Sequence, residues 1–124
     1  MLLGKGSEAG DELASRFSAH EVVCAPHLLD AEVGQVLRRF VLRRDLTRAT
    51  ADTLVEDFLA LPIRRYPHSL ILESALKYLE NVTVYDGLYL ALAEVLDCQL
   101  LTGDSALSQV PGCRADVTVL TTTA

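Results

Sequence analysis

The sequence has no tryptophan, one methionine and only three cysteines among its 124 residues. Cys24, Cys98 and Cys113 are far apart and form no Cys-x-x-Cys pair. This spacing argues against a zinc site, and an odd number of cysteines argues against a disulfide framework. We therefore expect reduced thiols, which are typical of a cytoplasmic protein.

The sequence also lacks any apolar run long enough to span a bilayer. Its most hydrophobic stretch, VYDGLYLALAEVLDCQLL, is interrupted by Asp86, Glu94 and Asp97. No basic segment followed by an apolar run marks a secretory signal at the start. Half of the residues are hydrophobic and the mean hydropathy is +0.26, which argues against disorder. These features predict one cytoplasmic domain over residues 1–124, with no membrane partner.

Positive charge is scarce as well. The net charge is −6, which counts against general nucleic-acid binding. Five arginines nevertheless lie within eleven positions, namely Arg38, Arg39, Arg43, Arg44 and Arg48. Two interpretations are open: a solvated helix face with extended arginine side chains, or a local patch that contacts phosphate.

Apolar periodicity and turn residues indicate strands that alternate with helices. The expected strands cover residues 21–26, 63–66, 98–104 and 117–120. The expected helices cover residues 7–17, 28–43, 47–61, 69–79 and 85–96, with a helical turn at 105–110. This alternation predicts an α/β protein, a three-layer α/β/α sandwich with a short parallel sheet.

The most informative residue is Glu32. It shares a helical stripe with five apolar residues, Leu29, Val33, Val36, Leu37 and Phe40. A glutamate seldom turns inward unless something pairs with it or binds it. Two aspartates follow in similar contexts, Asp86 at the start of a helix and Asp104 just past a strand.

We expect these three carboxylates to meet at one edge of the sheet. The helix after Asp86 covers about twelve residues, or ~18 Å. The strand that leads back to Asp104 covers about five residues, or ~17 Å, so the two lengths nearly cancel. Glu32 lies about one turn into the helix after its own strand, ~6 Å from the same edge. In open α/β sheets, ligands gather at this edge, beyond the carboxyl ends of the strands.

Acidic side chains gathered in one place repel one another, and a divalent cation removes that penalty. Carboxylate oxygens with room for water suit Mg²⁺ or Mn²⁺, and Thr102 offers a hydroxyl that can hold a carboxylate or a water. Structural roles remain open for each acid. Asp86 is also suited to a helix N-terminus, Asp104 to an N-cap, and Glu32 to pairing with an arginine.

Other candidate chemistry is weaker. The histidines show no metal-ligand spacing, and we expect turn or helix-start roles for His20, His27 and His68. The glycine-rich piece GKGSEAG lacks the lysine-serine ending of a phosphate-binding loop and follows no strand. The three acids therefore remain the leading candidate site.

Three segments resemble the PIN domain, in particular the VapC-type toxins of bacterial toxin–antitoxin pairs: APHLLDAEVGQVLRR, NVTVYDGLYLALAEVLDCQLLTGDSAL and VTVL. That family shows a glutamate in a helix with a basic end, then a YDxxYxALA helix, then an LLTxD strand end. The resemblance implies a Mg²⁺-dependent endoribonuclease that forms homodimers and is held inactive by a VapB-like antitoxin. It also implies that Glu32, Asp86 and Asp104 are the metal-site acids, supported by Thr102.

The chain departs from this family at its start. The family begins with a strand that ends in an aspartate and is followed by a helix, whereas residues 1–4 resemble the tail of that helix. Asp11 is no substitute, because no strand precedes it. We expect the first, central strand to be absent, which leaves its neighbours with unpaired backbone groups. Three explanations are open: a misassigned start codon, a natural truncation, or another segment in the position of the first strand. We favour the first.

The leading interpretation is a metal-dependent endoribonuclease toxin. Asp86 and Asp104 are its principal metal ligands, and Glu32 is a ligand or a general base. The candidate RNA contacts are Arg38, Arg39 and Arg43. The alternative is a catalytically weak or inactive PIN-like protein that binds an antitoxin without cleaving RNA. A metal-dependent DNA nuclease is a third possibility.

Overall fold

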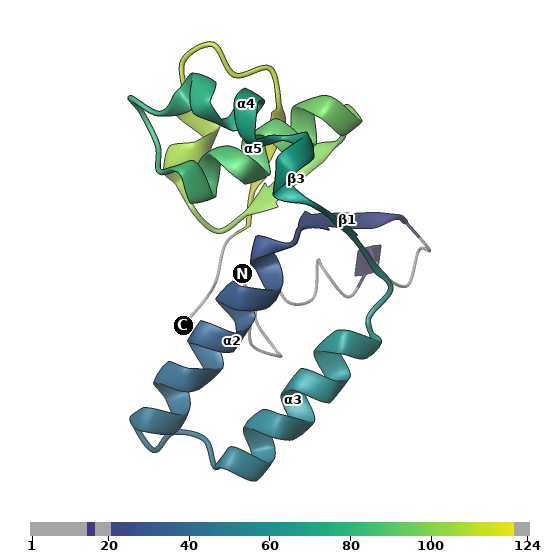
Figure 1. The fold of residues 1–124 in the computed structure, drawn as a ribbon, viewed down its shortest axis with the longest axis vertical. Helices are drawn as coiled ribbons and strands as arrows, with labels where there is room; N and C mark the ends of the chain where they lie inside the picture. The colour runs from purple at the N-terminus through teal and green to yellow at the C-terminus, as the bar shows by residue number, and fades with distance from the viewer. Residues whose placement is uncertain (1–14, 17–20, 121–124) are drawn as a thin grey trace.

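The computed structural model describes residues 15–16 and 21–120 (Figure 1). The elements in chain order are β1 (Val23–Pro26), α2 (Leu28–Leu42), α3 (Arg48–Ala60), β2 (Ile63–Tyr66), α4 (Leu72–Ala75), α5 (Val84–Leu96), β3 (Gln99–Thr102) and β4 (Asp116–Val119). Short 3-10 helices connect some of them, namely η1 (His68–Leu70), η2 (Leu76–Tyr78) and η3 (Ser105–Gln109). No helix in these ranges has the length and apolar character needed to cross a membrane.

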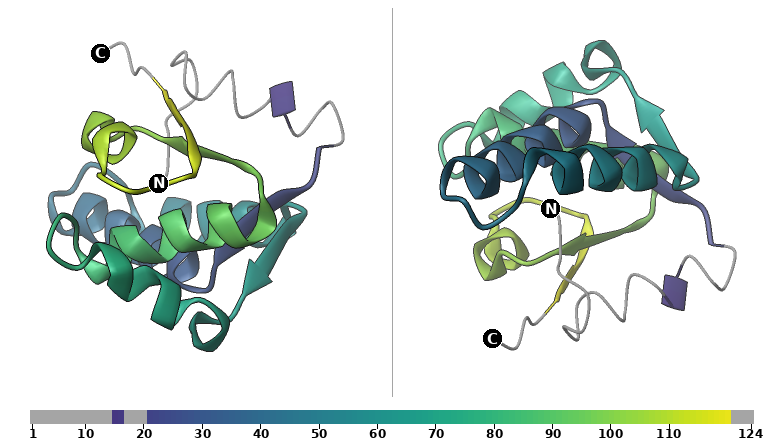
Figure 2. Two further views of the ribbon diagram at one scale, coloured as in Figure 1. Left: turned by 90° about the horizontal axis from the view of Figure 1, so that it is seen from above. Right: turned by 90° about the horizontal axis from the view of Figure 1, so that it is seen from below.

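The strands pair in parallel, as the alternation of strands and helices predicts. Strand β1 pairs with β2, with Val23 opposite Ile63, and β3 pairs with β4, with Gln99 opposite Asp116. These pairs are two separate two-stranded sheets, and within the described ranges no strand joins β1 to β3. Both views in Figure 2 show β3 and β4 apart from β1 and β2. The absence of the family's first strand stays a prediction, because residues 1–14 and 17–20 lie outside the described ranges.

Helix α5 is the centre of the core. Six of its thirteen residues are buried, because it packs on α4 at one side and on β3 and η3 at the other. Gly87 makes the first contact possible: a Cβ at this position would lie 2.8 Å from the carbonyl oxygen of Ala75 in α4. The apolar composition of α5 therefore follows from burial on two faces.

Helices α2 and α3 form an antiparallel hairpin (Figure 1). Val33 and Leu37 pack against Phe58, and Thr47 caps α3 by accepting a hydrogen bond of 3.1 Å from the backbone N–H of Thr50. The prediction that Phe40 belongs to the buried stripe is wrong, because its exposed fraction is 39% and it lies beside the turn that joins α2 to α3.

Two further expectations need correction. The helix predicted at 69–79 is divided into η1, α4 and η2, because the backbone leaves helical geometry at Ile71, with φ −128° and ψ −4°. This change accompanies the burial of Ile71 against α5, with an exposed fraction of 1%. The helix predicted at 7–17 lies outside the described residues except for positions 15 and 16.

Candidate functional site

The two aspartates lie at the starts of helices, Asp86 in α5 and Asp104 between β3 and η3. Asp86 is in the first turn of α5, and its backbone N–H donates a 3.2 Å hydrogen bond to the side chain of Thr83. Asp104 follows β3 and caps η3, because its Oδ1 accepts a 2.9 Å hydrogen bond from the backbone N–H of Ala106. The helix-start and N-cap roles left open by the sequence are therefore both present in the structure.

The three carboxylates lie within electrostatic range of one another. The pKa of Asp86 is raised, mainly by burial and next by the negative charge of Asp104, with a smaller effect from Glu32. The Thr83 side chain opposes this shift through a hydrogen bond. Segments that are far apart in sequence thus bring negative charge to one place, the start of α5 and the end of β3.

Glu32 lies one turn into α2 and is half-buried. The hydroxyl of Tyr89 in α5 donates a hydrogen bond to its Oε1, so its described partner is a tyrosine and not an arginine. Burial raises the pKa of Tyr89, and the hydrogen bond to Glu32 and its negative charge raise it further. Tyr89 lies three residues after Asp86 on the same helix face, but only the fold brings it to Glu32, so sequence reasoning missed this contact.

Thr102 supports Asp104 through the backbone. Its Oγ1 accepts a 3.1 Å hydrogen bond from the backbone N–H of Asp104. The contact is therefore to the main chain and not to the carboxylate that the sequence argument considered. It fixes the turn at the end of β3 and so fixes the position from which the Asp104 side chain extends.

The donor chemistry of the site fits a hard divalent cation with few protein ligands. Within the described ranges, no three His, Cys, Asp or Glu side chains lie close enough to hold a metal ion together. Mg²⁺ usually takes one or two carboxylates and completes its shell with water and substrate phosphate. Asp86 and Asp104 meet that requirement, while Glu32 is engaged by Tyr89.

The predicted RNA-contacting arginines are exposed. Arg38 and Arg39 lie in the second half of α2, and Arg43 is its C-cap. None of the three makes an ion pair with the described part of the chain. Two other arginines are paired: Arg48 lies 3.0 Å from Asp52, and Arg65 lies 2.9 Å from Asp30.

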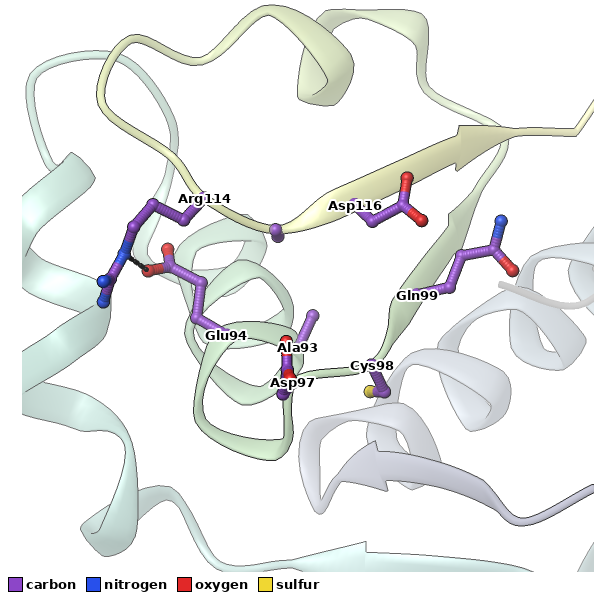
Figure 3. A pocket seen from close by; sticks show the side chains of 8 residues that line it. Ala93, Glu94, Asp97, Cys98, Gln99, Arg114 and Asp116 are labelled. Carbon is purple, nitrogen blue, oxygen red and sulfur yellow. Dashed lines mark ion pairs between the residues drawn. The ribbon is translucent and has the colours of Figure 1, made fainter.

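A cavity of about 480 Å³ lies away from these carboxylates, at the other end of α5. Glu94, Asp97, Cys98, Gln99, Arg114 and Asp116 line it, with Ala93 and Ala115 (Figure 3). Glu94 is well satisfied there: it accepts hydrogen bonds from Tyr78 and, at 3.5 Å, from Cys113, and it lies 3.8 Å from Arg114. In the sequence, Glu94 stands out only because it interrupts an apolar run.

The fold and the carboxylate site define an α/β protein with an acidic centre at the carboxyl end of a parallel strand. Comparison with known families makes this specific. The PIN domain model matches residues 2–112, and the chain belongs to the PIN domain family. The resemblance expected from the motifs is therefore confirmed.

Curated relatives place the chain beside the VapC proteins. It is 43% identical to Ribonuclease VapC1 of Mycobacterium tuberculosis over 118 residues, which cover 94% of this chain and 86% of that protein. It is 37% identical to Ribonuclease VapC12 of the same organism over 109 residues, or 88% and 84% of the two chains. It is 34% identical to VapC ribonuclease Mb0985 of Mycobacterium bovis over 110 residues, or 89% and 87%.

Proposed function

We propose that this chain is a Mg²⁺-dependent endoribonuclease, the toxin of a toxin–antitoxin pair. The observation that carries the proposal is the convergence of Asp86, Asp104 and Glu32 at the start of α5, in a chain whose curated relatives are VapC ribonucleases. Crowded carboxylates that raise the pKa of Asp86 are costly to a fold, and a divalent cation offsets that cost.

The chemistry follows from what each side chain offers. When bound, Mg²⁺ or Mn²⁺ lowers the pKa of water and offsets the charge that develops on a phosphate. Asp86 and Asp104 would hold the cation. Glu32, which forms no three-donor group with them in the described part of the chain, would act as the general base that accepts a proton from the attacking water, and Tyr89 fixes its carboxylate. Thr102 keeps Asp104 in place through the backbone.

The RNA backbone contacts the arginines of α2. Arg39 lies seven residues after Glu32, which is two turns further along the same helix face. Arg38, Arg39 and Arg43 are exposed and are not paired with the described part of the chain, so their charge is available to phosphate. A protein with a net charge of −6 then binds RNA locally and with strong salt dependence.

Protein partners complete the proposal: a VapB-like antitoxin and a second copy of the chain, in the cytoplasm. Large apolar side chains are exposed on two surfaces, which is typical of interaction sites. On the α2–α3 hairpin and the segment after it these are Phe40, Leu42, Leu59 and Leu61, with exposed fractions from 39% to 64%. On η1, α4 and η2 they are Leu70, Leu72, Leu76 and Leu79, with exposed fractions from 42% to 67%.

The test is RNA cleavage with Mg²⁺ or with EDTA. We expect total RNA to be cut only with the metal, and an Asp86→Asn variant to lose the cleavage. Single-stranded and duplex DNA serve as further substrates, and cleavage of DNA alone contradicts the proposal. Induced expression should slow growth, and the same substitution should relieve it.

One observation favours a second candidate, an antitoxin-binding protein without nuclease activity. The described residues contain no three-donor metal group, and the sheet is divided where a central strand is expected. Calorimetric titration with Mn²⁺ separates the two functions, because this candidate predicts weak binding. Tight binding together with metal-dependent cleavage rejects it.

A further inference from the structure

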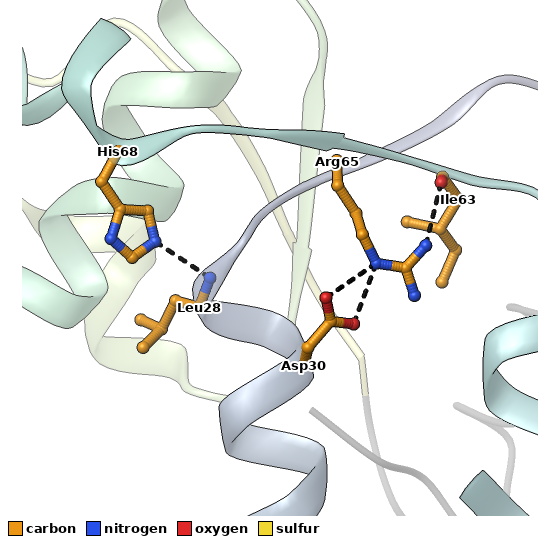
Figure 4. Close-up of polar contacts among 5 residues, drawn as sticks. All are labelled: Leu28, Asp30, Ile63, Arg65 and His68. Atoms are coloured by element: carbon orange, nitrogen blue, oxygen red, sulfur yellow. Dashed lines mark hydrogen bonds and ion pairs between the residues drawn. The ribbon is translucent and has the colours of Figure 1, made fainter.

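Helix α2, which carries Glu32, begins without a local cap. Its N-cap residue, His27, has helical φ and ψ of −53° and −27°, and its side chain makes no capping hydrogen bond. The first N–H groups of a helix have no partner within the helix, so their partners must come from elsewhere. Here one partner is distant in sequence: Nε2 of His68 accepts a 2.9 Å hydrogen bond from the backbone N–H of Leu28 (Figure 4).

The same turn is held at a second point. Nε of Arg65 in β2 lies 2.9 Å from both carboxylate oxygens of Asp30, in the first turn of α2 (Figure 4). Arg65 is itself fixed, because its Nη1 donates to the carbonyl oxygen of Ile63 at 3.2 Å and its guanidinium lies 5.4 Å from the ring centroid of Phe58. Its Nη2 is buried without an acceptor, which is unfavourable by itself, so the other contacts must hold the side chain in place.

Asp30 and Glu32 reach opposite sides of α2. Two residues along an α-helix correspond to a rotation of about 200°. Asp30 therefore extends toward β2 and Arg65, while Glu32 extends toward α5 and Tyr89. A turn held at only one side can rotate and carry the carboxylate with it. The contacts on the β2 side accordingly set where the Glu32 carboxylate lies.

We propose that His68 and Arg65 are positioning residues for Glu32. They hold the first turn of α2 against β2 and η1, and so present the Glu32 carboxylate to the site at the start of α5. This inference rests on the proposed nuclease function, because its purpose is to place one of the catalytic acids. From the sequence we expect His68 to be a turn or helix-start residue. It does hold the start of a helix, but that helix is α2 rather than η1, in which His68 itself lies.

The central test compares two substitutions of His68. His68→Ala removes the acceptor, and we expect Mg²⁺-dependent RNA cleavage to fall about 10-fold, within the range typical of residues that orient metal-site ligands. His68→Gln keeps an acceptor of similar reach and should restore most of the activity. Ser69→Ala, at the exposed neighbouring position, is the control and should leave activity unchanged.

A double-mutant cycle shows whether His68 acts through Glu32. In a Glu32→Gln background, His68→Ala should cause little further loss, because the carboxylate that it positions is gone. An equal loss in both backgrounds overturns the proposal and indicates a general effect on folding. Arg65→Ala should behave like His68→Ala in this cycle, with exposed Arg64→Ala as its control.

Hydrogen exchange tests the contact without reference to activity. In the ¹⁵N-labelled chain, the amide of Leu28 should exchange roughly fivefold faster in His68→Ala than in the wild type, and His68→Gln should protect it. Unchanged exchange at Leu28 overturns the proposal. A wild-type chain that cleaves no RNA with Mg²⁺ overturns the proposed function, and the exchange rates then decide by themselves whether His68 holds the turn.

Discussion

Helix α5 has an acidic side chain near each end, and the two differ in what surrounds them. Near its C-terminal end, Glu94 has an exposed fraction of 13% and is surrounded by donors, namely the hydroxyl of Tyr78, the thiol of Cys113 and the guanidinium of Arg114. At its N-terminal end, Asp86 has two other carboxylates for neighbours, and its pKa is raised first by burial and then by their charges. Both acids are partly removed from water, but only Glu94 is neutralised by the chain itself.

We propose that this difference separates a structural acid, Glu94, from a functional one, Asp86. A buried carboxylate that serves the fold is expected to have hydrogen bonds or an opposite charge, because leaving it unpaired is costly. A cluster of carboxylates without opposite charges destabilises the fold. Such clusters are typical of sites that bind a cation or carry out chemistry. Each of the following predictions compares the two ends of α5.

The largest expected effect is on activity at the Asp86 end. Asp86→Asn should reduce metal-dependent RNA cleavage at least about 100-fold, because it removes a charged ligand without changing shape. The folded state should not lose stability. Glu94→Gln should leave the activity of the folded protein within a few-fold of wild type. Initial rates on one RNA, normalised to folded protein by circular dichroism, make the comparison, and equal losses at both ends contradict it.

The second effect is on stability at the Glu94 end. Glu94→Ala should lower the free energy of unfolding by about 2 kcal/mol, because the hydroxyl of Tyr78, which is buried, loses its acceptor. Glu73→Ala, an exposed acid in α4, is the matched control and should change it by less than about 0.5 kcal/mol. Urea unfolding at pH 7 measures both. If Glu94→Ala lowers the free energy of unfolding no more than Glu73→Ala does, the structural role of Glu94 is contradicted.

Two tyrosines give a third comparison, with smaller expected effects on activity and stability. The hydroxyl of each one donates a hydrogen bond to a glutamate. Tyr89→Phe releases Glu32 and should reduce RNA cleavage about 10-fold. Tyr78→Phe releases Glu94 and should lower the free energy of unfolding by about 1 kcal/mol while the folded protein keeps its activity. A loss of activity in Tyr78→Phe that matches the loss in Tyr89→Phe contradicts the division between the two ends.

Local features of this fold were predictable from the sequence, because periodicity and end signals decide them. The starts of α2 and α3, expected at residues 28 and 47, and the apolar character of α5 appear within one residue of where the pattern placed them. The segment around Ile71 was not predictable, because its irregular backbone depends on burial against α5, which comes from a different part of the chain.

The same distinction applies to the site. The sequence singled out the three acids as candidates from their position in helix stripes and at strand ends, since those positions are local. It did not identify Tyr89 as the partner of Glu32, nor His68 and Arg65 as the partners of the first turn of α2. Those contacts join residues 35 to 57 positions apart, and no local pattern specifies them.

The smallest expected effect is the pH dependence of stability at Asp86. Because its pKa is raised in the folded state, the folded chain holds this proton more tightly than the unfolded chain does. Asp86 therefore costs stability at neutral pH, and that cost disappears as the pH falls through the folded pKa toward the unfolded value of 3.8. Solvent screening keeps the effect small, because Asp86 is only half-buried.

Without divalent cations, Asp86→Asn should melt on the order of 2 °C above wild type at pH 7, and the difference should close as the pH approaches 4. The two proteins differ at this one position, so the difference in Tm isolates Asp86. Added Mg²⁺ should reverse the order at pH 7, because only the wild type gains stability from binding it. A wild type that is the more stable protein at pH 7 in EDTA would show that Asp86, like Glu94, is a structural acid.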